Sequence, residues 1–101
     1  MIHSQDSVLK FVVSPQNIHP KIAKIILFGS RARGDSHERS DYDLAVVAPT
    51  MTSEEWASWA LNIREKVPTL RGVDLILSNE DTSESLKSAI AKDGKVIYER
   101  K

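Results

Sequence analysis

Two aspartates separated by one residue, Asp41 and Asp43, have the residue type and spacing that most clearly indicate chemistry in this chain. Side chains alternate along a strand, so both carboxylates are expected to point to the same side. Two ionised carboxylates at close range repel each other, and a divalent cation between them removes that cost. Mg²⁺ suits such a pair, because it prefers oxygen ligands and usually takes one or two carboxylates together with substrate phosphates.

A third acid, Asp74, lies between Val73 and Leu75 in another apolar run, where a charge is otherwise hard to explain. If the two strands are neighbours, Asp74 can face the same site as the aspartate pair. Three acids on adjacent strands can hold two metal ions, which is the arrangement used for in-line phosphoryl transfer.

The segment before the aspartate pair has the features of a phosphate-binding turn. Gly29 and Ser30 precede Asp41 by ten intervening residues. Glycine allows a backbone to approach a phosphate closely, and a serine hydroxyl with nearby backbone N–H groups can donate to its oxygens. Arg31 and Arg33 are suited to charge-assisted contacts with a triphosphate. The segment lacks the Gly-Lys-Ser/Thr ending of a P-loop.

At these residues the chain resembles the nucleotidyltransferase superfamily related to DNA polymerase beta, and especially its minimal nucleotidyltransferases from bacteria and archaea. The resemblance extends from about residue 22 to residue 98. Its motifs are Leu27-Phe28-Gly29-Ser30-Arg31-Ala32-Arg33-Gly34, then Ser40-Asp41-Tyr42-Asp43-Leu44, then the apolar-flanked Asp74.

The resemblance implies a site in which Gly29 and Ser30 hold the triphosphate, Asp41 and Asp43 bind metal, and Asp74 completes the catalytic and metal-binding set. It implies transfer of a nucleotidyl group, expected to be AMP from Mg²⁺–ATP with two Mg²⁺ ions, to a hydroxyl. Small members are often antitoxins paired with a helical toxin of the HEPN type, and some transfer AMP to that partner. RNA or a small molecule is an alternative acceptor, and a non-catalytic antitoxin that only masks its partner is the alternative function.

The elements that must position these residues follow from alternating apolar and amphipathic segments. Apolar runs predict strands at residues 22–28, 43–48, 73–77 and 96–98, and residues 30–40 are expected to form a polar turn. Thr52 and Glu55 have capping-box spacing and predict a helix over residues 52–67. A second helix is predicted from residue 81 or 82 to 92, with Leu86, Ala89 and Ile90 inward, whereas residues 6–13 fit a helix or a strand.

Alternating strands and helices indicate a small α/β domain, and a single domain over residues 1–101 is expected from the length. The resemblance adds a mixed sheet of about four strands with helices packed on it, the nucleotidyltransferase fold. The apolar stripe of the 52–67 helix contains Trp56 and Trp59, which suit core packing or, alternatively, a partner surface.

Composition sets limits on other functions. Fourteen basic residues balance fourteen acidic ones, so the bulk charge does not indicate a nucleic-acid binder. The absence of cysteine excludes disulfides and thiolate metal sites. His3, His19 and His37 are scattered and do not form a metal-binding set. No apolar stretch is typical of a signal peptide or a membrane span, so no membrane association and a cytoplasmic location are expected.

Overall fold

A four-stranded sheet forms the centre of the structure, a computed structural model that describes residues 7–29, 32, 41–67, 72–78 and 84–100. The strand order is β3-β2-β1-β4, with β1 antiparallel to both β2 and β4 and β2 parallel to β3. The sheet is therefore mixed, which confirms the predicted fold class. The strands are β1 (Lys24–Phe28), β2 (Tyr42–Val47), β3 (Val73–Leu77) and β4 (Lys95–Glu99).

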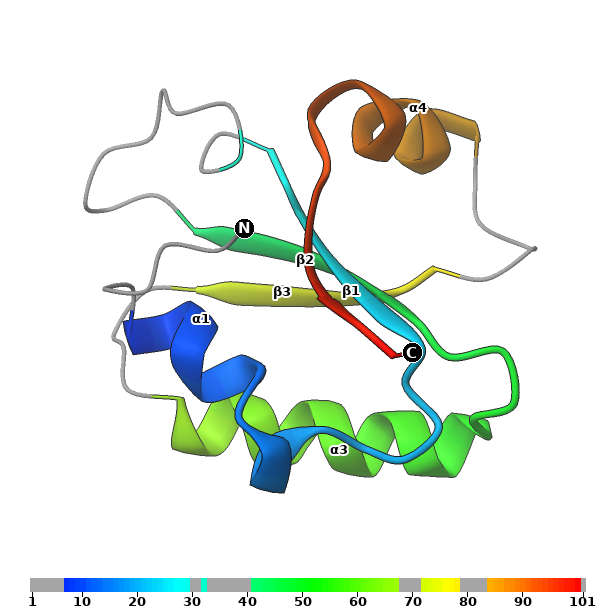
Figure 1. Ribbon diagram of the computed structural model, residues 1–101. Coiled ribbons are helices and arrows are strands. Elements are labelled where there is room, and N and C mark those ends of the chain that lie inside the picture. Colours follow the sequence, from blue (N-terminus) through cyan, green and yellow to red (C-terminus); the bar gives the residue numbers. More distant parts are fainter. Residues whose placement is uncertain (1–6, 30–31, 33–40, 68–71, 79–83, 101) are drawn as a thin grey trace.

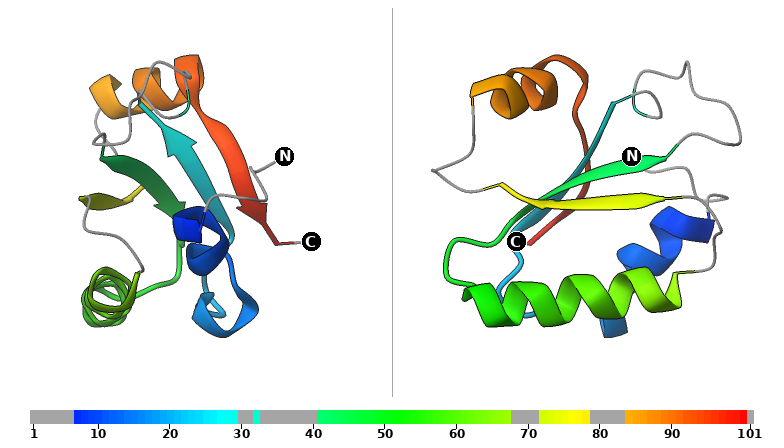
Figure 2. Two further views of the ribbon diagram at one scale, coloured as in Figure 1. Left: turned by 90° about the vertical axis from the view of Figure 1, so that its left-hand side faces the viewer. Right: turned by 180° about the vertical axis from the view of Figure 1, so that it is seen from behind.

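Helices cover the two faces of this sheet unequally. Helices α1 (Ser7–Val12) and α3 (Ser53–Lys66) lie against one face, and α4 (Glu84–Asp93) lies over the other, as Figures 1 and 2 show. The short 3-10 helix η1 (Pro15–Asn17) follows α1. Helix α3 carries the chain from the end of β2 back to the start of β3, which is why these two strands run parallel.

The sequence around Thr52 starts α3 as predicted. The Thr52 hydroxyl accepts a hydrogen bond from the Glu55 N–H at 3.1 Å, and the Thr52 N–H donates to the Glu55 carboxylate at 2.9 Å. This capping box satisfies backbone donors that the first helical turn leaves without partners. The helix ends at Lys66, and Val67 is its C-terminal cap residue.

The hydrophobic core lies between the sheet and the pair α1 and α3. Trp59 is buried in this core, and its indole N–H donates to the Asn17 carbonyl at 2.7 Å. Trp56 is half-buried with its ring centroid 5.6 Å from that of Trp59. Both tryptophans therefore pack as core residues. The largest fully buried side chains are Leu9, Val12, Ile22, Ile25, Leu44, Val46 and Ile63.

The face under α4 is packed less completely. None of the described α4 residues is buried, and Leu86, Ala89 and Ile90, which were expected to point inward, are only half-buried. These three residues nevertheless lie on the less exposed side of α4, as predicted, because the other described residues from Glu84 to Lys92 are exposed. Among the strands, α4 packs mainly against β1.

Several boundaries differ slightly from those expected. The segment that fitted either a helix or a strand forms α1, β2 begins one residue earlier than predicted, and β4 is longer by one residue at each end. The expected turn over residues 30–40, apart from Ala32, and the expected cap at Asp81 or Thr82 lie outside the described residues. No helix among the described residues is long and apolar enough to cross a membrane.

Candidate functional site

Asp43 and Asp74 lie side by side on neighbouring strands. In the parallel pairing of β2 with β3, Asp43 is directly opposite Asp74. Residues in register on adjacent strands point to the same face of a sheet. Asp43 and Asp74 therefore share the face over which α4 lies, because the alternate residues Tyr42 and Leu44 are buried on the core side. Asp41 lies immediately before β2, two residues from Asp43.

These acids are accessible to a ligand. Asp41 and Asp74 are exposed and Asp43 is half-buried, and among the described residues no polar or charged side chain is fully buried. The Asp41 and Asp74 carboxylates are therefore in contact with solvent.

Gly29 brings the end of β1 against Asp43. Phe28 is opposite Asp43 in the antiparallel pairing of β1 with β2, so Gly29 follows directly beside the acid. Gly29 has a φ of +78°, and a Cβ added to it would overlap the Asp43 carboxylate oxygen Oδ2. Its carbonyl accepts a hydrogen bond from the Ala32 N–H at 3.1 Å, so the chain turns immediately after β1. A side chain at position 29 would be strained and would displace Asp43.

Asp41 has a partner that the sequence did not suggest. The Gly72 N–H donates to Asp41 Oδ1 at 3.2 Å, and the Gly72 carbonyl accepts from the Tyr42 N–H at 2.9 Å. Gly72 was not among the predicted site residues. The available signal was a glycine two positions before the third acid, at the entrance of a predicted strand, where glycine often marks a close approach of another group.

The remaining predicted site residues lie outside the part of the chain that the structure describes. These are Ser30, Arg31 and Arg33, together with His37. Gly29, which is described, is placed directly beside the acids, and the segment that follows it contains the predicted triphosphate ligands. The described part of the predicted constellation therefore consists of the three acids and Gly29, which lies against Asp43.

The predicted magnesium site is not complete within the described residues. Among the described residues, no three His, Cys, Asp or Glu side chains are close enough together to hold a metal ion by themselves. Mg²⁺ does not need such a set, since it commonly binds one or two carboxylates and takes its other ligands from water and substrate phosphates. Asp43 and Asp74 supply two carboxylates in register, and Asp41 supplies a third two residues away.

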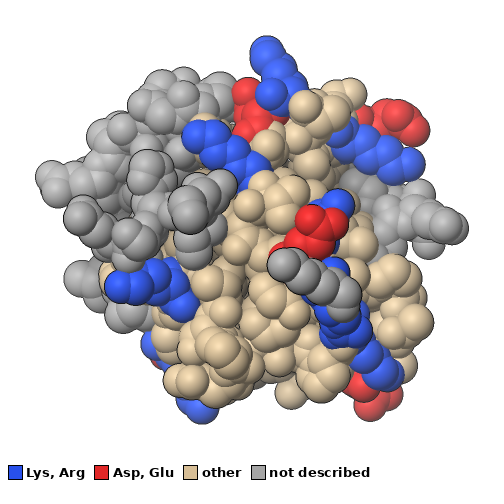
Figure 3. All heavy atoms as spheres, in the orientation of Figure 1, with Lys and Arg blue, Asp and Glu red and all other residues tan. Residues whose placement is uncertain are grey.

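On the face seen in Figure 3, the described charged residues do not single out a nucleic-acid surface. The described lysines and arginines there are interspersed with aspartates and glutamates. A binder of nucleic acid usually presents basic residues clustered on one face. The mixed surface gives no support to RNA as the acceptor.

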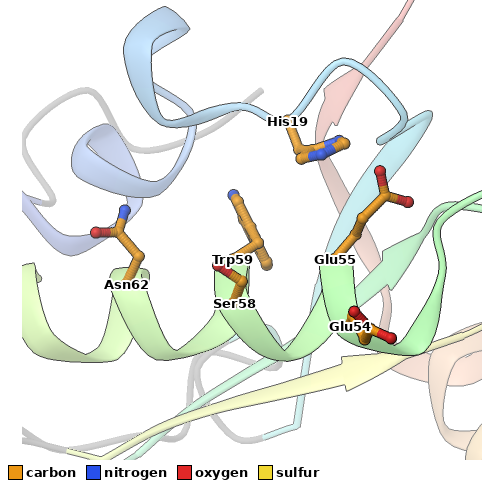
Figure 4. Close-up of a pocket in the computed structure, with 6 residues that line it drawn as sticks. All are labelled: His19, Glu54, Glu55, Ser58, Trp59 and Asn62. Atoms are coloured by element: carbon orange, nitrogen blue, oxygen red, sulfur yellow. The ribbon is translucent and has the colours of Figure 1, made fainter.

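A hollow of about 470 Å³ lies away from the acids, on the core-helix side of the sheet. Figure 4 shows its walls, which come from α3 between Glu54 and Asn62 and from the loop before β1. His19 Nδ1 accepts a hydrogen bond from the Lys21 N–H at 3.0 Å, and Lys21 forms an ion pair with Glu55 at 2.9 Å. These contacts organise the loop and the helix start. The hollow is lined by His19, Glu54, Glu55, Ser58, Trp59 and Asn62.

Solved structures share this fold. A chain of a toxin–antitoxin complex with AMP-PNP has a TM-score of 0.66 and 27% identity, over 98% of this chain and 76% of that one. A chain of a tri-AMPylated Shewanella oneidensis HEPN toxin in complex with its MNT antitoxin has a TM-score of 0.56 and 26% identity, over 84% and 62%. A nucleotidyltransferase-like structure from Sulfolobus solfataricus has a TM-score of 0.59 and 23% identity, over 91% and 77%.

No match was found among curated protein sequences. The family model for the polymerase beta nucleotidyltransferase domain matches residues 14–101, which include every strand of the sheet and all three acids. The extent of this match agrees with the mixed sheet and with the position of the acids on it. The chain therefore belongs to the polymerase beta nucleotidyltransferase family.

Proposed function

We propose that this protein transfers AMP from Mg²⁺–ATP to a hydroxyl of a partner protein, as the antitoxin of a HEPN/MNT toxin–antitoxin pair. The observation that carries the proposal is the register of Asp43 with Asp74 on parallel strands, at the point where Gly29 ends β1. Support for ATP and for a protein partner comes from the similar complexes, one with AMP-PNP and one with an AMPylated HEPN toxin.

The proposed roles follow from position. Gly29 lets the backbone at the end of β1 approach the triphosphate, and Ser30, Arg31 and Arg33 donate to its oxygens. Asp41 and Asp43 ligate Mg²⁺, with Asp74 completing the metal set. Bound Mg²⁺ would neutralise charge on the phosphates and polarise the phosphorus for attack.

In the proposed reaction the acceptor hydroxyl oxygen attacks the α-phosphorus of ATP. The new oxygen–phosphorus bond forms as the bond from the α-phosphorus to the bridging oxygen breaks, and pyrophosphate leaves with that electron pair. The hydroxyl proton passes to the Asp74 carboxylate, which is exposed and lies opposite Asp43 on the neighbouring strand. A carboxylate within reach of the attacking hydroxyl can serve as its general base or orient it.

The binding half of the proposal is tested without a partner. At a hundredfold excess over Kd, a ligand of the folded state stabilises it by about 2.7 kcal/mol. Mg²⁺–ATP should therefore raise the melting temperature of wild type by several degrees, while Asp43→Asn should respond little. Glu65→Gln, which neutralises an exposed carboxylate on α3, is the matched control and should respond like wild type. An equal shift in all three proteins would contradict the assignment of Asp43.

The transfer half needs the protein encoded beside this one. That protein is incubated with wild type, ATP and Mg²⁺, and its intact mass is measured. An added AMP mass that is lost with Asp74→Asn, while Mg²⁺–ATP still stabilises that variant, supports transfer. A stable complex with no added mass would instead identify a non-catalytic antitoxin that masks its partner.

A further inference from the structure

The backbone of Gly72 touches Asp41 more closely than any side chain would permit. A Cβ added to Gly72 would lie 2.8 Å from Asp41 Oδ1, 2.9 Å from Cγ and 3.0 Å from Oδ2. The carboxylate therefore occupies the space that a side chain at position 72 would need. The Gly72 N–H also donates to Oδ1 of the same carboxylate at 3.2 Å.

We infer that Gly72 is a positioning residue, whose backbone holds the Asp41 carboxylate in the orientation in which it ligates the metal ion. The inference rests on the proposed function, because it assigns to Asp41 the metal-ligating role proposed above. It adds to the proposed site a residue that belongs neither to the three acids nor to the Gly29-Ser30 motif.

The requirement for glycine at position 72 is one of space and not of backbone conformation. Among the described glycines only Gly29 has a positive φ, so alanine could adopt the backbone of Gly72 without strain. The atoms that a methyl group at position 72 would meet belong to the end of one exposed, flexible side chain. Gly72→Ala should therefore move the Asp41 carboxylate while leaving the fold intact.

Asp41 needs such support because of its position. It is exposed, and it stands immediately before β2 instead of inside the strand. An unsupported surface carboxylate samples several rotamers. The conformational entropy lost when it is ordered then reduces the free energy of metal binding. The Gly72 N–H fixes Oδ1, and the bond from the Tyr42 N–H to the Gly72 carbonyl keeps the two chain segments together at 2.9 Å.

The same arrangement recurs on the other side of β2. Gly29, at the end of β1, lies against Asp43, and Gly72, at the start of β3, lies against Asp41. Each strand next to β2 thus presents a glycine backbone to one of the two aspartates. These two contacts explain how the carboxylates of Asp41 and Asp43, which belong to one short segment, are both held in place.

The test compares wild type, Gly72→Ala and the control Gly94→Ala in two measurements. Urea unfolding without ligand gives the stability, and a calorimetric titration of AMP-PNP at a series of Mg²⁺ concentrations gives the Mg²⁺ level for half-maximal binding. Loss of an outer contact to a metal ligand typically weakens metal affinity about 10–100-fold. Gly72→Ala should raise the half-maximal Mg²⁺ concentration by about that factor, with the urea midpoint close to that of wild type.

Gly94→Ala is the matched control. A Cβ at position 94 would overlap the Ile90 carbonyl oxygen and lie 2.9 Å from Ile26 Cγ2, in the packing between α4 and β1. This variant should lower the urea midpoint and leave the Mg²⁺ requirement unchanged. The amide proton of Gly72 provides a separate readout, because Asp41→Asn should shift its resonance by removing a charged acceptor, whereas Asp74→Asn should not.

The possible results distinguish a failure of the role inferred for Gly72 from a failure of the proposed function. Wild-type Mg²⁺ dependence in Gly72→Ala, or losses of stability and binding that match those of a folding defect, would overturn the role of Gly72 and leave the proposed function standing. Failure of wild type to bind AMP-PNP in a Mg²⁺-dependent manner would instead refute the proposed function, and the role of Gly72 would fall with it.

Discussion

The two faces of the central sheet differ in packing and in charge. The face toward α1 and α3 holds the largest fully buried side chains of the strands, Ile25, Leu44 and Val46, packed against Leu9 and Ile63 of the helices. The face toward α4 carries Asp43 and Asp74, and α4 contributes no buried residue. The predicted acids therefore lie outside the packing that keeps the domain folded.

This division has a physical origin in the strands themselves. Alternating side chains allow one strand to place Tyr42 and Leu44 in the core and Asp43 on the opposite face. A fully covered second face would remove the carboxylates from water, which is costly for ionised groups.

The largest expected effect on stability comes from truncating an isoleucine to alanine on each face of the sheet. Ile63→Ala removes a fully buried side chain of α3 and should lower the free energy of unfolding by about 2–5 kcal/mol. Ile90→Ala removes a half-buried side chain of α4 and should cost clearly less, roughly 1 kcal/mol. Urea unfolding measures both. Equal losses would show that the α4 face contributes to stability as much as the core face.

A smaller effect of opposite sign is expected on the acid face. Like charges directly opposite each other on paired strands are destabilising, on a scale of about 0.2–1 kcal/mol for cross-strand pairs. Asp74→Asn removes the repulsion with Asp43 and should raise the free energy of unfolding in Mg²⁺-free buffer by about that amount. A loss of stability in Asp74→Asn, measured beside Glu65→Gln, would mean that Asp74 supports the fold.

The smallest expected effect is the pH dependence of the stability contributed by Glu55, at the start of α3 on the core face. Hydrogen bonding to the Thr52 backbone, followed by that to Lys21, lowers the pKa of Glu55 from 4.5 to about 2. Because the folded-state pKa is depressed, Glu55 stabilises the fold above pH 4.5, and this contribution is lost as the pH falls from 4.5 toward 2. The effect is small because the groups are partly exposed and solvent screens the ion pair.

Glu55→Gln tests this pH dependence. The difference in urea midpoint between wild type and Glu55→Gln should shrink over that pH range, while Glu54→Gln, next to it on α3, should track wild type. A constant difference between wild type and Glu55→Gln at every pH would show that the carboxylate charge is not what stabilises the helix start.

Much of the fold could be predicted because local signals agreed with the final structure. The capping box of Thr52 and Glu55 starts α3 as expected, and the apolar runs form β1, β2 and β3 close to their predicted bounds. The 6–13 segment could not be assigned, because its β-branched residues suit both kinds of element. Packing of Val8, Leu9 and Val12 into the core decided in favour of α1.

Only those features of the site that depend on local backbone structure could be predicted from the sequence. The sequence alone determined that Asp43 lies on the face opposite Tyr42 and Leu44, because alternation is a local property of extended backbone. Asp41 was predicted to lie on the same strand, whereas β2 begins at Tyr42. Tertiary structure decided that β3 lies beside β2 in parallel, with Asp74 opposite Asp43, since the pairing depends on the path of α3 across the sheet. It also decided the contact of Gly72 with Asp41, two residues 31 positions apart that only strand pairing brings together.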